Sequence, residues 1–148
     1  MKILVCTDGS EQSLKAVNQA SKIAEGCGEV AVTLIYVYER KASLTYGSEV
    51  YLTGEVLERL KEAERENKAE YKKILEENAK VFKDKNMKVT TVFKEGHPAE
   101  TIAEFVAEEN FELVVIGSRG MSGVKKMFLG SVSNAVLQEV KANVLVVK

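Results

Sequence analysis

The chain has 148 residues, of which 45% are hydrophobic and 29% charged, so it fits one globular domain, residues 1–148, with a single substantial core. Its 22 acidic and 21 basic residues nearly cancel, which argues against nucleic acid as the primary partner. Two cysteines without a Cys-x-x-Cys pair and a single histidine argue against a disulfide scaffold or a zinc site.

Five apolar, β-branched runs predict strands, and helical patterns lie between them. In chain order, the expected elements are a strand at Ile3–Cys6, a helix at Glu11–Glu25, a strand at Val30–Val37, a helix at Gly54–Lys85, a strand at Lys88–Phe93, a helix at Pro98–Asn110, a strand at Leu113–Ile116, a helix at Val132–Val140 and a strand at Val144–Val147. Strands that alternate with helices indicate an α/β fold with a mainly parallel sheet and helices on both faces.

The chain opens directly into the first strand, without a basic leader, and its apolar runs are too short to span a bilayer. We therefore expect a cytoplasmic protein with no membrane partner.

The first helix has Ser10 or Gly9 as its candidate N-cap, and Gly26 to Gly28 should end it with a C′ glycine.

The long second helix has an apolar stripe at helical spacing, which we expect to face inward. This stripe comprises Val56, Leu60, Ala63, Asn67, Tyr71, Ile74, Leu75 and Phe82. The segment between Glu39 and Gly54 is polar with aromatic interruptions and has no steady period, so it is either a lid or a surface loop.

A glycine-rich stretch from Gly117 to Ser131 follows the fourth strand and leads into the last helix. Strand, glycine-rich loop and helix N-terminus, in that order, favour a phosphate site, because the first N–H groups of a helix lack internal acceptors. No Gly-Lys pair occurs in the chain, which excludes a P-loop, and the glycine spacing does not match the dinucleotide fingerprint Gly-x-Gly-x-x-Gly.

Two segments should meet at the carboxyl edge of the sheet, namely the turn from Cys6 to Ser10 and the glycine-rich loop. Asp8 either accepts hydrogen bonds from a ribose, holds a divalent metal beside phosphates, or caps the first helix. Ser131 and Ser133 are candidates both for capping the last helix and for binding phosphate.

Three basic residues of the glycine-rich loop are candidates for neutralising phosphate charge, namely Arg119, Lys125 and Lys126. Backbone groups near Val37, at the end of the second strand, are the expected place for a base. His97 lies on the same rim, where a lone histidine is more often incidental than catalytic.

These residues resemble the ATP-binding branch of the universal stress protein family, and the resemblance covers essentially the whole chain. The family signature of Gly, two residues, Gly, nine residues, Gly and Ser/Thr is met by Gly117, Gly120, Gly130 and Ser131. The opening run from Ile3 to Ser10 is similar to the family's first strand and Asp-bearing turn.

The resemblance implies an open five-stranded parallel sheet of order 3-2-1-4-5, a Rossmann-like and flavodoxin-like three-layer sandwich. It implies a homodimer joined through its last strands that holds ATP, or AMP or ADP, sometimes with Mg²⁺ or Mn²⁺. Carried over by position, adenine and ribose would contact Thr7, Asp8 and Val37, and the phosphates would lie among Gly117, Arg119, Gly120, Gly130, Ser131, Val132 and Ser133.

The leading hypothesis is thus a nucleotide-dependent sensor without catalytic residues, active in the stress response. One alternative is a slow metal-dependent ATPase or nucleotidyl-transfer enzyme that uses Asp8 and His97. A second alternative is an interaction scaffold that requires no nucleotide.

Overall fold

The computed structural model describes residues 1–39, 54–121 and 129–148. Its elements are β1 (Lys2–Cys6), α1 (Glu11–Gly26), β2 (Ala31–Tyr38), α2 (Gly54–Lys83), β3 (Val89–Glu95), α3 (Pro98–Glu109), β4 (Leu113–Gly117), α4 (Ser131–Glu139) and β5 (Asn143–Val147). Every expected strand and helix is present, with bounds that differ from the prediction by at most two residues. The hypotheses on the 40–53 segment and on Lys125 and Lys126 lie outside the described residues.

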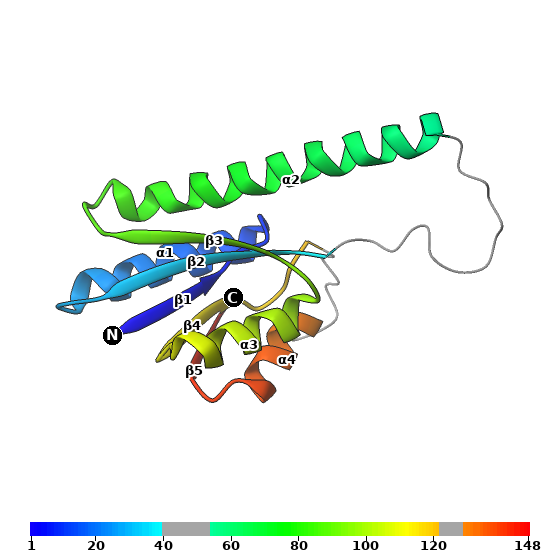
Figure 1. The fold of residues 1–148 in the computed structure, drawn as a ribbon. Helices are drawn as coiled ribbons and strands as arrows, with labels where there is room; N and C mark the ends of the chain where they lie inside the picture. The colour runs from blue at the N-terminus through cyan, green and yellow to red at the C-terminus, as the bar shows by residue number, and fades with distance from the viewer. Residues whose placement is uncertain (40–53, 122–128) are drawn as a thin grey trace.

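The strands form one parallel sheet of order β3-β2-β1-β4-β5, which confirms the predicted topology. Figure 1 shows the sheet between two helical layers, with α1 and α2 on one face and α3 and α4 on the other. The strand order reverses at β1, whose neighbours are β2 and β4. In an open parallel sheet, this is the position where ligands bind, at the carboxyl ends of the strands.

Two hydrophobic cores fill the spaces between the layers, and β1 supplies both. Ile3 and Val5 point into the core shared with α1 and α2, whereas Leu4 and Cys6 point into the core shared with α3. This alternation follows from the two-residue period of a strand. It also decides which side chains at the end of β1 face the carboxyl-edge pocket and which face α2.

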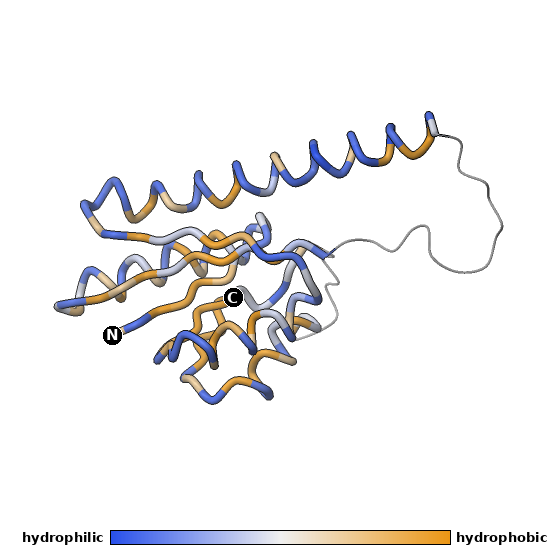
Figure 2. Tube along the Cα trace, in the orientation of Figure 1, coloured by the Kyte–Doolittle hydropathy of each residue, from blue (hydrophilic) through white to orange (hydrophobic). Residues whose placement is uncertain are grey.

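Helix α2 departs from the prediction over its first half. Tyr71, Ile74 and Leu75 pack against the core, whereas Val56 and Leu60 are 42% and 38% exposed. The 30 residues of α2 span about 45 Å, and the eight-residue β2 spans only about 26 Å, so the sheet is too short to cover the whole helix. Figures 1 and 2 show this half projecting past the sheet with hydrophobic residues still recurring along it.

Two of the expected helix ends are also corrected. Helix α1 begins as predicted, because the Ser10 hydroxyl accepts a hydrogen bond from the N–H of Ser13 at 3.2 Å. Its end does not use a left-handed glycine, since Cys27 is the C-cap and neither Gly26 nor Gly28 has a positive φ. Helix α4 is capped by Gly130 rather than by either predicted serine.

Candidate functional site

A pocket opens at the carboxyl ends of β1, β2 and β4, where the strand order reverses. It encloses about 810 Å³ of space, part of which is open to solvent. Its lining combines four segments that are distant in sequence: Cys6, Thr7, Asp8 and Ser13; Ile35 and Val37; Pro98 and Ile102; and Ile116, Gly117, Arg119, Gly120, Met121, Gly130, Ser131, Val132 and Ser133. All ten predicted binding residues belong to this lining.

One side of the pocket is apolar. Ile35 and Val37 project from the same face of β2, Pro98 and Ile102 come from α3, and Ile116 comes from β4. Cys6 completes this wall, and burial, with a smaller contribution from the Asp8 charge, raises the pKa of its thiol to about 12. A thiol that stays neutral acts as a small hydrophobic group, so this side suits a flat, apolar ring.

The pairing of β1 with β2 ends beside this wall. The N–H of Thr7 donates to the carbonyl of Ile35 at 3.0 Å, one residue beyond the end of β1. The hydroxyl of Thr7 lies on the α1 and α2 side of the sheet, 2.6 Å from Asn78 Nδ2 and 3.3 Å from Ser13 Oγ. Thr7 therefore presents its backbone to the pocket, and its side chain holds the turn in place.

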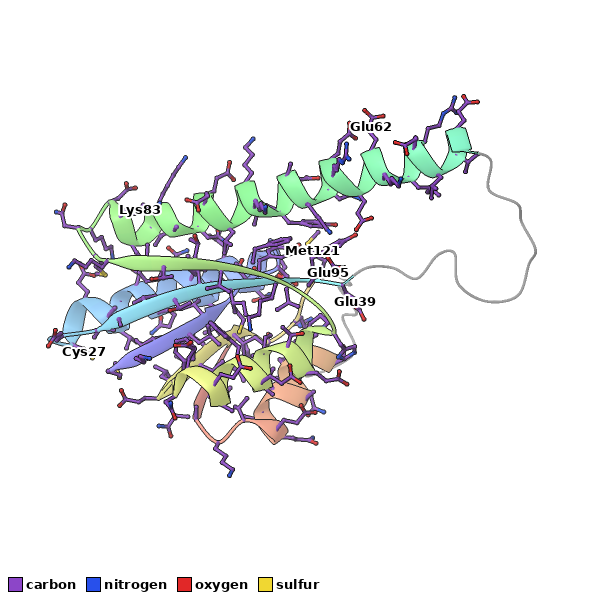
Figure 3. The ribbon with its side chains drawn as sticks, in the orientation of Figure 1. Cys27, Glu39, Glu62, Lys83, Glu95 and Met121 are labelled. Atoms are coloured by element: carbon purple, nitrogen blue, oxygen red, sulfur yellow. The ribbon has the colours of Figure 1, made fainter. Side chains whose placement is uncertain are left out.

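Asp8 joins the turn after β1 to the glycine-rich loop, the two segments that were expected to meet. One of its carboxylate oxygens accepts from the N–H of Ser10 at 3.0 Å, and the other accepts from the N–H of Met121 at 3.2 Å, across the pocket. Asp8 is not the cap of α1, because Ser10 has that role. Figure 3 places Met121 at the same end of the sheet as Glu39 and Glu95, opposite to Cys27 and Lys83.

The glycines of the loop serve different purposes. A Cβ at Gly117 would lie 2.7 Å from the backbone carbonyl carbon of Gln12 in α1, and one at Gly120 would lie 2.5 Å from the Asp8 carboxylate. Gly117 is needed because the neighbouring backbone cannot move away, whereas a side chain at position 120 would displace the Asp8 carboxylate. A Cβ at Gly130 would meet nothing among the described residues closer than 3.4 Å, so packing does not demand glycine there. The family resemblance had placed all three glycines beside the phosphates.

The start of α4 supplies hydrogen-bond donors to the pocket. Gly130 donates its own N–H to the carbonyl of Ser118 at 2.7 Å, which fixes the entry into the helix. Ser131, Val132 and Ser133 follow, and the first N–H groups of a helix have no intrahelical acceptor. These donors and the positive end of the helix dipole favour an anion at this point.

The two serines of this turn have different environments. The Ser133 hydroxyl is buried and lies 3.0 Å from the carbonyl oxygens of both Ser118 and Gly130, so its proton is engaged within the protein. The prediction that Ser133 caps α4 is wrong, because Gly130 is the N-cap. The phosphate role of Ser133 stays a prediction, and its N–H is the group that is free of these two bonds. Ser131 is exposed at the first position of α4, and its hydroxyl faces no such constraint.

The remaining candidates differ in their placement. Arg119 is half-buried in the lining, and its Nε has no hydrogen-bond partner within the described residues. His97 is exposed at the N-cap of α3 and does not belong to the lining.

Within residues 1–39, 54–121 and 129–148, no three His, Cys, Asp or Glu side chains gather as a metal site would need. No helix in the same ranges could cross a membrane.

Several lining residues were not predicted. Ile35 was within reach of the sequence, because it is two residues from Val37 and so shares its face of the strand. Ile102 lies one turn into α3, and no sequence pattern distinguishes it from the other apolar residues of that helix. Met121 had no distinguishing sequence pattern, and its place depends on the contact of its N–H with Asp8.

Comparison with known proteins gives a consistent result. The model of the universal stress protein family matches residues 1–148. Universal stress protein YxiE of Bacillus subtilis is 37% identical over 150 residues, covering 99% of this chain and 98% of that protein. The solved structure of MJ0577 from Methanocaldococcus jannaschii is 28% identical with a TM-score of 0.80, covering 99% and 94% of the two chains. A universal stress protein solved in complex with cAMP is 25% identical with a TM-score of 0.64, covering 100% and 97%.

Proposed function

The chain belongs to the universal stress protein family, and we propose that it binds ATP in the pocket at the carboxyl edge of the sheet. The observation that carries this proposal is the pairing, in one pocket, of an apolar wall with the N-terminus of α4. The apolar wall suits a purine ring, and the helix N-terminus suits phosphates. The solved relative in complex with cAMP, an adenine nucleotide, supports the choice of ligand.

The lining suggests how ATP would lie. Adenine would occupy the wall of Cys6, Ile35 and Val37, where the pairing of β1 with β2 ends and backbone groups near Thr7 and Val37 would meet the base edge. Asp8 would accept hydrogen bonds from the ribose hydroxyls. The phosphates would lie at the glycine-rich loop and the first turn of α4, beside Gly117, Arg119, Gly120, Gly130, Ser131, Val132 and Ser133.

A divalent cation fits this arrangement only together with the nucleotide. Asp8 is the single carboxylate among the described residues that line the pocket, whereas Mg²⁺ takes six oxygen ligands. The phosphates and water would supply the other ligands of Mg²⁺ or Mn²⁺. The cation would then neutralise phosphate charge beside Arg119.

We further propose that the protein acts as a nucleotide-dependent regulatory homodimer in the cytoplasm. Strand β5 lies at the edge of the sheet, and its Val144, Leu145, Val146 and Val147 are only half-buried. Leu137 of α4 is 45% exposed. A second copy placed along β5 would pair this strand edge and cover apolar surface near it.

The same geometry favours binding over catalysis. His97, the residue considered for acid or base chemistry, is exposed and does not line the pocket. Metal-dependent ATP turnover above background that disappears in Asp8→Ala, while ATP binding survives, would replace the binding proposal with the enzyme alternative.

Two measurements on purified protein test the proposal. Chemical analysis of the ligand released on denaturation should identify an adenine nucleotide. ATP at 100 times its Kd should then stabilise the stripped protein by about 2.7 kcal/mol, which corresponds to a rise in melting temperature of roughly 5–10 °C. An empty protein whose melting temperature ATP does not change would refute the proposal. Sedimentation at micromolar concentration tests the homodimer, and a monomer would contradict that part.

A further inference from the structure

Asn78 is a polar residue in an apolar part of α2. It is only 8% exposed and lies among Leu75, Ala79 and Phe82, the other buried residues of this helix. A buried amide is costly unless it is hydrogen-bonded. Asn78 Nδ2 lies 2.6 Å from the hydroxyl oxygen of Thr7, which is 71 residues away, in the turn after β1.

The direction of this hydrogen bond follows from its neighbours. The Ser13 hydroxyl uses its proton to donate to the carbonyl of Ser10 at 2.9 Å, so it must accept from Thr7 at 3.3 Å. The Thr7 hydroxyl, having given its proton to Ser13, must accept from Asn78. A directed chain therefore runs from Asn78 through Thr7 and Ser13 to Ser10, the N-cap of α1.

This chain fixes the turn that carries Asp8. Ser10, at its far end, donates its N–H to the Asp8 carboxylate at 3.0 Å, while Thr7 is the residue before Asp8. Helix α2 also contacts the turn directly, because a Cβ at Gly9 would lie 3.0 Å from Ile74 Cδ1. Gly9 has φ +82°, so the turn has a conformation that few other residues would maintain.

We propose that Asn78 is a positioning residue that holds the Asp8 carboxylate toward the ribose of the bound nucleotide. The inference rests on the proposed function, and it assigns to α2 a role in selecting the sugar rather than the base or the phosphates. Asn78 itself is outside the pocket lining, so its side chain would not contact a nucleotide held there. Its effect is transmitted through Thr7.

The test compares ATP with 2′,3′-dideoxyATP, which lacks both ribose hydroxyls. The wild-type chain should bind ATP roughly tenfold or more tightly, as expected for a hydrogen bond to a charged carboxylate. In Asn78→Leu, the affinity for ATP should fall and the affinity for dideoxyATP should stay the same. The ratio of ATP affinity to dideoxyATP affinity should therefore drop to about threefold or less. Thr7→Val removes the same hydrogen bond from the other side and should give the same ratio, and the double variant should lose nothing further.

Leu75→Ala is the matched control, because Leu75 is equally buried on α2 but makes no hydrogen bond with the turn. Leu75→Ala should lower the melting temperature and leave the ratio of ATP to dideoxyATP affinity unchanged. Asn78→Leu would behave in the same way if Asn78 only stabilised the fold. An unchanged ratio in folded Asn78→Leu and Thr7→Val overturns this inference alone. A wild-type chain that binds both nucleotides equally overturns the inference together with the proposed contact between Asp8 and the ribose, but leaves ATP binding standing. A wild-type chain that binds neither nucleotide overturns the proposed function and the inference with it.

Discussion

Replacing Ser131 by proline tests the phosphate contacts of α4 without disturbing the helix. Ser131 is the first residue of α4, where proline is favoured because the missing N–H is unpaired in any case. The preceding residue must be extended, and Gly130 already has φ −73° and ψ 163°. Ser131 is exposed, and its N–H has no acceptor among the described residues. The free energy of unfolding should therefore be unchanged or higher by about 0.4–1 kcal/mol.

ATP affinity should respond differently. A hydrogen bond to a charged group contributes about 1.5–3 kcal/mol, so loss of the Ser131 N–H should weaken ATP binding roughly 10- to 150-fold. Ser131→Ala removes only the hydroxyl, and the difference between the two variants isolates the backbone donor. Isothermal titration with ATP and with adenosine gives both affinities. Adenosine carries no phosphate, so its affinity should be equal in all three proteins.

The result that refutes this reasoning is a folded Ser131→Pro variant that binds ATP as tightly as Ser131→Ala. In that case the Ser131 N–H would not contact the phosphates. A parallel loss of adenosine affinity would also contradict it, because the change would then have disturbed the base wall.

Other predictions follow from the same geometry. Gly117→Ala forces a Cβ against the α1 backbone at 2.7 Å, so it should cost about 1–3 kcal/mol of stability by denaturant titration, and a neutral effect would contradict the packing argument. Gly120→Ala displaces the flexible Asp8 carboxylate, so it should weaken ATP binding while changing the melting temperature little, and a normal ATP affinity would count against Asp8 as a ligand. A maleimide at about pH 8 should label exposed Cys27 and spare buried Cys6 in native protein, and equal labelling would contradict the burial of Cys6. The pKa of Cys6 rises from 9.0 to about 12 on folding, so its contribution to stability should be full below pH 9 and lost as the pH rises to 12, with a smaller decline in Cys6→Ala.

The strands and helices could be predicted because their periodicities are local. The buried β1 reads as a continuous apolar run, and Pro98 marks the first turn of α3. The strand order came from the resemblance to a family, since no pattern in the chain specifies which strand pairs with which. The structure confirms that order.

The inward stripe of α2 shows where local reasoning failed. The apolar spacing continues to Val56, but whether it is buried depends on how far the sheet extends beneath the helix. Likewise, the sequence made Ser133 a candidate N-cap of the last helix, and only in the folded chain does the Ser118 carbonyl lie 3.0 Å from the Ser133 hydroxyl. Distances between segments that are remote in sequence decided both cases.

Asn78 shows a pattern that was present in the sequence but not used. It occupies an apolar-stripe position, with Leu75 three residues before it and Phe82 four residues after it. A polar residue at such a position predicts a buried hydrogen-bond partner. The identity of that partner, Thr7, becomes apparent only when α2 lies over the end of β1.

The most direct test of the central claim is isothermal titration of the nucleotide-stripped protein with ATP, with and without Mg²⁺, using AMP, ADP and GTP for comparison. We predict saturable binding of about one ATP per chain, at micromolar or tighter Kd, which corresponds to about −8 kcal/mol. GTP should bind more weakly, because the wall beside Val37 would be fitted to adenine. The absence of saturable binding for every nucleotide would contradict the account and would favour an interaction scaffold with the same fold.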